Sequence, residues 1–258
     1  MAEAVVKNER VLEVYESFVK HMKKFLDEQQ LNHEEYTNFV EWADRLGRSG
    51  EIPLFLDVFV ETYVLEAKYK KLPGTEPSLL GPYFTEGSPL IEDKPAVMSM
   101  RPVDKEKGEK LIFRGNVSSV NGQKLANTKV EFWQNDADGL YSNFDSDAPD
   151  FNLRGHFYTD ENGDFEVHSI VPIPYQIPTD GPTGEFVSAA GYHAYRPAHL
   201  HLMLEKEGHE TLITQVFFQG DEWLETDVAN GVRSSLLTGL KQVGDHKEAS
   251  LDFVLRTE

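Results

Sequence analysis

Apolar residues recur every three to four positions along the first part of the chain, the spacing of one face of an α-helix. A first helix is predicted over residues 9–29 and a second from Asn32, where Glu35 lies three positions on as in a capping box. A third is predicted over 52–69, before Pro73 and Gly74 end the pattern. The stripe of the first helix consists of Val11, Tyr15, Phe18, Met22 and Phe25, widened by Val14, Val19 and Leu26.

Residues 74–102 are rich in proline and glycine and show little period, so we expect a long ordered loop. After this loop the period changes to two, the spacing of a strand with one buried face. Short apolar segments then alternate with turns such as Asn121-Gly122, a strong hairpin signal. The predicted strands cover residues 111–120, 130–134, 156–159, 165–171, 199–205 and 211–218. Regularly spaced short strands predict a β-sandwich or barrel.

The change of period predicts an α+β organisation. We expect an N-terminal helical domain over residues 1–75, a linker over 76–102 and a β-sandwich domain over 103–258. The helical segment is short for an independent enzyme. Its apolar stripes are expected to pack on each other, on the β-domain or on a second subunit.

Charge and composition narrow the class of protein. The formal net charge is −19, from 25 basic and 44 acidic side chains, so the chain repels nucleic acid and anionic membranes, and neither is expected as a partner. No apolar run is long enough to cross a membrane and residues 1–10 lack a signal core, which favours the cytoplasm. The absence of cysteine excludes disulfides, iron–sulfur clusters and cysteine nucleophiles, and leaves His, Asp, Glu and Tyr as possible metal ligands.

One pair of histidines has the spacing of metal ligands. His199 and His201 lie two positions apart in an apolar predicted strand, so both side chains point to the same face. An H-x-H pair alone is a weak signal. Two imidazoles facing a core, however, would cost free energy without a metal or other partners, and this favours a metal site. The nearby acidic residues Glu205 and Asp221 lie near strand ends and are expected to be solvated.

Two tyrosines are further candidates. Tyr141 follows a predicted turn over residues 136–140, and Tyr175 lies in the proline-rich segment 171–178. Proline holds a side chain in place at low entropic cost. From the residues alone, the more common role of either tyrosine would be core packing with a bonded hydroxyl.

Taken together, these motifs resemble the intradiol ring-cleavage dioxygenases, in the catechol and chlorocatechol 1,2-dioxygenase branch. They occur in the order and at the approximate spacing of that family, and the resemblance covers nearly the whole chain. The matching segments are 81–83, 138–145, 174–178, 181–184, 196–201 and 214–216.

The resemblance implies a non-haem Fe(III) centre. The family binds Fe(III) through two tyrosinates, two histidines and a hydroxide, and Tyr141, Tyr175, His199 and His201 match the protein ligands with no departure. By resemblance, Tyr141 and His199 are equatorial and Tyr175 and His201 axial. Phenolate is a hard, strongly donating ligand that favours Fe(III), unlike the two-His-one-carboxylate Fe(II) sites.

The resemblance also implies roles for neighbouring residues. Tyr175 would act as an internal base towards the substrate. Arg196 would stabilise negative charge on the ring, with a structural salt bridge as its alternative role, and Gln215 would hydrogen-bond the ligands or the substrate. The implied substrate-binding residues, besides Arg196, are Leu79, Gly81, Pro82, Tyr83 and, from the third helix, Asp57.

The implied reaction is the opening of catechol rings between the two hydroxyl carbons by O2, which gives muconates. The resemblance also implies a homodimer joined through the N-terminal helices, with lipid possible between these helices. Unsubstituted, methyl and chloro catechols all fit the residues. Segment 133–136 is also similar to hydroxyquinol 1,2-dioxygenases, which makes hydroxyquinol the alternative substrate. The protocatechuate branch generally lacks the helical domain. An alternative of another class is a non-catalytic β-sandwich that binds a lipid or a partner protein.

Overall fold

The computed structural model describes residues 8–101 and 105–258. By packing, the chain divides into two compact units, one that ends at Ser49 and one that runs from Gly50 to Glu258. The domain limits 1–75, 76–102 and 103–258 stay a prediction.

The first unit consists of two helices, α1 (Glu9–Gln29) and α2 (His33–Ser49). At the start of α2 the Asn32 side chain accepts the Glu35 N–H at 3.0 Å, while the Glu35 carboxylate accepts the Asn32 N–H at 2.9 Å. This reciprocal pair is the expected capping box. No residue of α1 is buried, and Phe18 in the middle of its apolar stripe is 58 % exposed.

The second unit begins with two short helices where the sequence predicts one. Helices α3 (Ile52–Leu56) and α4 (Thr62–Tyr69) flank a π-helical turn over Asp57–Glu61. A π-turn widens the helix by one residue and shifts the side chains that follow it, an effect that helical spacing alone does not predict. Such turns are frequent at functional sites.

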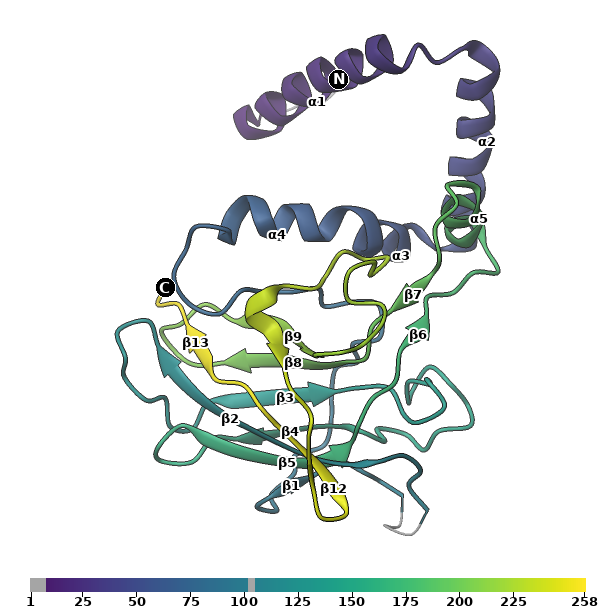
Figure 1. Cartoon of the computed structure of the whole chain (residues 1–258). Helices are drawn as coiled ribbons and strands as arrows, with labels where there is room; N and C mark the ends of the chain where they lie inside the picture. The colour runs from purple at the N-terminus through teal and green to yellow at the C-terminus, as the bar shows by residue number, and fades with distance from the viewer. Residues whose placement is uncertain (1–7, 102–104) are drawn as a thin grey trace, which may run out of the picture. The chain divides into compact units, whose positions relative to one another are not determined.

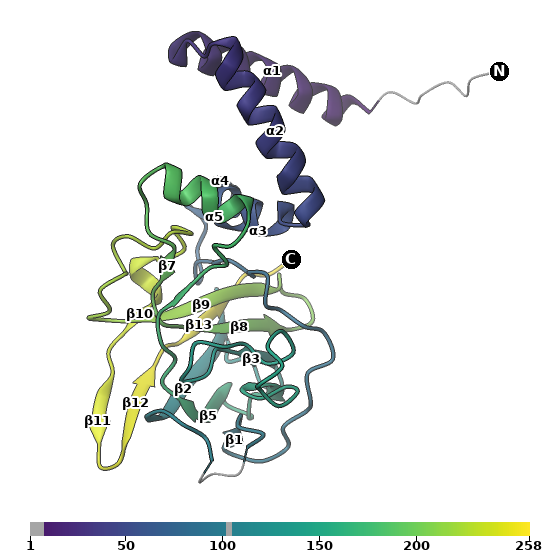
Figure 2. The ribbon, with the colours of Figure 1, turned by 90° about the vertical axis from the view of Figure 1, so that its right-hand side faces the viewer.

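Two packed sheets form the body of the second unit, with α3 and α4 above the second of them (Figures 1 and 2). In the first sheet the strand order is β1-β5-β2-β12-β11, with β13 also paired to β2, and in the second it is β10-β9-β8-β3-β4. The bounds of the first sheet are β1 Ala96–Val97, β2 Lys110–Ser119, β5 Asp164–Ile170, β11 Lys241–Val243, β12 His246–Ser250 and β13 Phe253–Leu255. Those of the second are β3 Lys129–Trp133, β4 Arg154–Tyr158, β8 His199–Glu205, β9 Leu212–Phe218 and β10 Leu237–Thr238.

The hydrophobic core lies between these sheets, where strand alternation directs the apolar side chains. Phe113 of β2, Phe132 of β3 and Leu200 of β8 are all fully buried in it. A helical segment followed by a β-sandwich confirms the predicted α+β fold. No helix among the described residues is long and apolar enough to cross a membrane.

Smaller elements lie at one end of the sandwich. A ladder of two short strands, β6 (Tyr175–Gln176) and β7 (Tyr195–Arg196), is antiparallel, and α5 (Pro182–Ala189) lies in the segment between them. A second small core contains Leu54 of α3, Val58 of the π-turn and Val187 of α5, together with Ile177 and Ala194, which adjoin β6 and β7. A short 3-10 helix over Ser234–Leu236 precedes β10.

Candidate metal centre

The two histidines project from β8, which lies in the middle of the second sheet. Leu200 and Leu202 point into the sandwich core, so strand alternation directs His199 and His201 to the opposite face. Both imidazoles are almost completely buried, at 2 % and 1 % exposed, and their Nε2 atoms lie 3.1 Å apart. Two unprotonated ring nitrogens do not approach this closely unless a proton or a cation lies between them.

The environment keeps both imidazoles neutral. Burial, reinforced by the Arg196 guanidinium, lowers the pKa of His199 to about 3. Burial and the neighbouring His199 lower the pKa of His201 well below its usual range. Each ring therefore offers a nitrogen lone pair at neutral pH. Nδ1 of His199 lies 2.7 Å from the Pro197 carbonyl oxygen, which orients Nε2 towards His201.

Tyr141 enters the same space from the loop after β3. The Asp136 side chain accepts the N–H groups of Asp138 and Leu140, at 2.9 and 3.1 Å, and Gly139 takes a positive φ of +83°. This tight turn delivers Tyr141 at 3 % exposed, with its ring centroid 6.2 Å from that of His201.

Tyr175 comes from the β6–β7 ladder, in which it lies directly opposite Arg196. Its side chain is 8 % exposed. The ring centroid lies 5.5 Å from that of Tyr141 and 5.7 Å from that of His199. Three different elements thus bring two phenols and two imidazoles to one buried position.

The donor set fits a hard, trivalent cation. The Tyr141 hydroxyl is buried and has no hydrogen-bond partner among the described residues, an arrangement that costs free energy unless the oxygen binds something. Burial and the neighbouring Tyr175 raise the pKa of Tyr141 well above its usual value, so a phenolate here requires a cation to stabilise it. No group of three or more His, Asp or Glu side chains that could hold a metal occurs within residues 8–101 and 105–258.

A buried ion pair lies beside the histidines. Arg196 contacts Asp227 at 3.0 and 3.1 Å, and both side chains are almost inaccessible to solvent. Although burial disfavours its charge, Asp227 raises the pKa of Arg196 above its usual value. The guanidinium also donates to the Gln215 side-chain oxygen at 2.9 Å and lies 3.4 Å from Nε2 of His199. Asp227 is a functional candidate that the sequence did not indicate, because it lies in a loop without period.

Gln215 lies beside His201, its cross-strand neighbour in the β8–β9 register. Its amide nitrogen donates to the Leu79 carbonyl oxygen at 2.8 Å and lies 3.4 Å from Nδ1 of His201. The buried Gln215 therefore connects Arg196, a histidine and the loop that begins at Leu79.

That loop reaches the site at Gly81 and Tyr83. Gly81 has a φ of +73°, and a Cβ at this position would lie 3.6 Å from Cε1 of His201. The Tyr83 ring stacks on Tyr141, with 4.4 Å between centroids and 9° between planes. Pro82 between them is exposed.

The π-turn contributes carboxyl groups, but at different depths. Asp57, expected at the pocket, is half-buried, and burial raises its pKa. It makes no hydrogen bond or ion pair with the rest of the described chain. Glu61, which the sequence did not indicate, accepts the Leu80 N–H at 3.4 Å, and its other carboxyl oxygen is buried without a partner.

Replacing this carboxylate should stabilise the fold in a pH-dependent way. Burial raises the pKa of Glu61, so the folded state disfavours its charge, and this penalty grows as the pH rises through the folded-state pKa. Glu61→Gln keeps an acceptor for Leu80. We expect it to raise the free energy of unfolding by about 1 kcal/mol at pH 8, with little effect at pH 4.5.

Urea unfolding of iron-free protein at both pH values measures this difference. Glu66→Gln is the control, because Glu66 is paired with Arg233 at 3.3 Å and its replacement should bring no gain that grows with pH. An equal effect of Glu61→Gln at both pH values would show that the carboxylate carries no burial penalty.

A cavity of about 790 Å³ lies elsewhere on the sandwich. It is lined by the 90–96 segment, by strands of the first sheet that include Arg114 and Phe165, and by Phe157 of β4. None of the predicted site residues lines it. Size alone therefore does not identify the functional site of this protein.

Comparisons with known proteins agree with this site. Residues 79–257 match the family model described as "Dioxygenase", and residues 8–75 match "Catechol dioxygenase N terminus". The chain is 36 % identical to a chlorocatechol 1,2-dioxygenase of Rhodococcus opacus, over 92 % of each chain. It is 34 % identical to a 6-chlorohydroxyquinol 1,2-dioxygenase of Cupriavidus pinatubonensis, over 96 % of this chain and 91 % of that protein. The crystal structure of a 3-chlorocatechol 1,2-dioxygenase from Rhodococcus opacus superposes with a TM-score of 0.90, at 39 % identity over 98 % of this chain and all of that one.

The fold and the comparisons define an intradiol ring-cleavage dioxygenase. The chain belongs to this family and, within it, to the catechol and chlorocatechol 1,2-dioxygenase branch. The expectation of an enzyme of the catechol 1,2-dioxygenase type is confirmed. The alternative of a non-catalytic β-sandwich is set aside, because the curated relatives are enzymes along nearly the full length of this chain.

Proposed function

We propose that this protein opens the ring of chlorinated and unsubstituted catechols between the two hydroxyl carbons, consuming O2 and forming cis,cis-muconates at a non-haem Fe(III) centre. Tyr141, Tyr175, His199 and His201 are the proposed iron ligands. The observation that carries the proposal is the convergence of four buried donors, with histidine Nε2 atoms 3.1 Å apart beside an unpartnered Tyr141 hydroxyl. Two phenolates make this donor set suited to the ferric state.

When bound, Fe(III) would supply a Lewis-acidic, redox-active centre for a chelated catechol. Tyr175, as a metal-bound phenolate, is placed to accept a proton at its oxygen. Burial raises its pKa, and the positive charge of Arg196 opposite it offsets part of the cost of forming the phenolate. Arg196 would stabilise negative charge that develops on the substrate ring. Asp227 and Gln215 hold its guanidinium in one orientation.

The aromatic wall of the site suits a planar substrate. Tyr83 and Tyr141 stack face to face, and Tyr175 meets Tyr83 edge-on with 6.1 Å between centroids. Leu80 packs against the same cluster. An apolar, aromatic surround favours a ring with chloro or no substituents over one with an additional hydroxyl, which would need a polar partner.

Hydroxyquinol is the alternative substrate, favoured by the 6-chlorohydroxyquinol relative. A panel of catechol, chlorocatechols, methylcatechols and hydroxyquinol, assayed with iron-reconstituted protein, separates the two possibilities by kcat/KM. With ¹⁸O2, both labelled atoms should enter a ring-opened dicarboxylic product. Iron-replete, folded protein that consumes no O2 with any of these substrates would contradict the proposed function.

We further propose that the active protein is a homodimer in which α1 of each copy covers the apolar stripe of the other. The stripe is long, and Tyr15, Phe18 and Phe25 are each about half exposed or more, at 62, 58 and 49 %. Exposed apolar surface of this extent marks an interaction site on a protein with a strongly negative, soluble surface. Lipid held between the helices is the other possible cover.

Phe18→Glu should therefore convert the dimer to monomers in sedimentation analysis. Lys20→Glu introduces the same side chain on the opposite face of α1 and should leave the dimer intact. Native mass spectrometry of the wild type tests for lipid. A wild type that is monomeric at micromolar concentration without lipid contradicts the proposal.

A further inference from the structure

A second buried arginine lies next to Tyr141. Arg154, the first residue of β4, is 2 % exposed. Unlike Arg196, it forms no ion pair with any described carboxylate, and its Nη2 has no hydrogen-bond partner among the described residues. The nearby Glu131 attracts Arg154 without contacting it and pairs with Lys129 at 3.1 Å. A buried cation without a carboxylate in contact is costly.

The side-chain hydrogen bonds of Arg154 go to residues next to Tyr141 in the chain or stacked on it. Nε donates to the Ser142 carbonyl and hydroxyl oxygens at 3.1 and 3.0 Å, and Nη1 donates to the Tyr83 carbonyl oxygen at 2.6 Å. Since Tyr83 and Tyr141 stack on each other, Arg154 fixes the backbone on both sides of this stacked pair.

The positive charge also faces the ring of Tyr141. The guanidinium carbon lies 5.7 Å from the Tyr141 centroid and 5.6 Å from that of Phe144. A cation at this distance is attracted to the π-electrons of the ring, and more strongly as the ring becomes richer in electrons. A guanidinium in a protein keeps its proton at neutral pH, so this charge is present.

We infer that Arg154 is a positioning residue beside the metal centre. Its positive charge balances the negative charge of the Tyr141 phenolate, withdraws electron density from that ring and raises the reduction potential of the bound iron. Its hydrogen bonds fix the Tyr141–Tyr83 stack. This inference rests on the proposed iron site. Tyr141 as an anionic ligand explains why a guanidinium is buried here without a carboxylate. Arg196, on the side of Tyr175, already has Asp227 as its partner.

Two variants separate charge from hydrogen bonding. Arg154→Gln removes the charge and keeps donors, whereas Arg154→Lys keeps the charge and loses the forked donor geometry. We expect the midpoint potential of the iron, measured by reductive titration, to fall in Arg154→Gln and to stay near the wild-type value in Arg154→Lys. We expect kcat to fall about 10- to 100-fold in Arg154→Gln, the range typical of residues that orient metal ligands.

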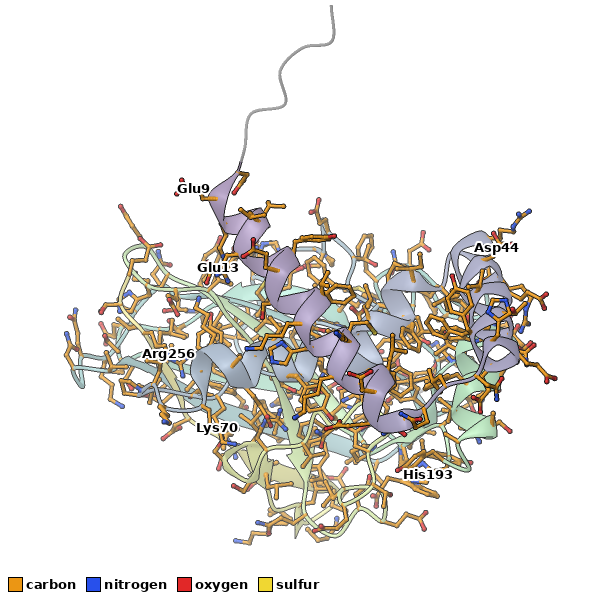
Figure 3. The ribbon with its side chains drawn as sticks, turned by 90° about the horizontal axis from the view of Figure 1, so that it is seen from above. Glu9, Glu13, Asp44, Lys70, His193 and Arg256 are labelled. Atoms are coloured by element: carbon orange, nitrogen blue, oxygen red, sulfur yellow. The ribbon has the colours of Figure 1, made fainter. Side chains whose placement is uncertain are left out.

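A matched control is available at Arg256. It is also buried, has unpartnered nitrogens and lies over a tyrosine ring, with its guanidinium carbon 4.9 Å from the Tyr69 centroid. It lies beside the end of α4 near Lys70 (Figure 3). Arg256→Gln should leave the potential unchanged.

An unchanged potential in folded, iron-containing Arg154→Gln overturns the inference and leaves Arg154 a structural tie. If Arg154→Gln does not fold, Arg154→Met, a neutral side chain of similar length, takes its place: a fallen potential supports the charge role, and an unchanged potential contradicts it. A wild type that binds no iron through tyrosine would instead reject the proposed function, which keeps the two failures distinct.

Discussion

Tyr141→Phe should lose ring-cleaving activity by about 10³-fold or more and bind less than one equivalent of iron. The substitution removes one of the four proposed protein ligands. The loss of activity should therefore exceed the 10- to 100-fold that is typical of residues that only support a metal ligand. The hydroxyl that it removes is buried without a partner in the described structure. Iron-free Tyr141→Phe should therefore be as stable as the wild type or more so, by about 1 kcal/mol.

Iron analysis, steady-state O2 uptake and urea unfolding of the iron-free proteins measure these effects. Tyr83→Phe is the matched control, because Tyr83 stacks on Tyr141 in the same aromatic cluster but is not a proposed ligand. It should keep its iron. Full iron occupancy in Tyr141→Phe, with near-normal turnover, would remove Tyr141 from the site.

Arg196→Gln should reduce kcat by about 10²- to 10³-fold, the usual consequence of removing a preorganised electrostatic contact from an active site. It should also destabilise the fold by about 3–5 kcal/mol, because Asp227 would remain buried without a counter-charge. In the wild-type protein, Arg196 and the N–H groups of Ala229 and Gly231 keep the pKa of Asp227 low despite its burial.

The double variant Arg196→Gln/Asp227→Asn tests both roles of the ion pair. It removes the two buried charges together, so it should recover much of the stability while activity stays low. Recovery of activity along with stability would show that Arg196 has only a structural role, the alternative that the sequence left open.

The sequence predicted the site best where local geometry determines it. Period two places His199 and His201 on one face of a strand, and the structure brings their Nε2 atoms to 3.1 Å. Gln215 was expected only from the family resemblance, and the structure pairs it with His201 in the adjacent strand. For the two histidines, strand alternation suffices.

The tyrosines required the family resemblance, because their convergence is not local. Tyr141 depends on a turn organised by Asp136, and Tyr175 on a ladder of two short strands that no period reveals. The π-turn replaces what the sequence predicts as an uninterrupted helix over 52–69. It brings Glu61 to the loop at Leu80.

Arg154 and Asp227 were missed for a related reason. The role of each depends on a contact with a residue distant in sequence, Tyr83 for Arg154 and Arg196 for Asp227. Neither position carries a local signal, because buried charges are recognised by their surroundings rather than by spacing. Helix α5, over Pro182–Ala189, was likewise not predicted, because it is short and flanked by glycine and proline.

The visible absorption spectrum of the purified, iron-loaded protein, before and after anaerobic addition of catechol, tests the central claim most directly. Tyrosinate ligation of Fe(III) predicts a broad charge-transfer band that moves to longer wavelength when the catechol chelates the metal. Iron-replete, folded protein without such a band would contradict ligation by Tyr141 and Tyr175. A band that catechol does not change would contradict direct binding of the substrate to the iron.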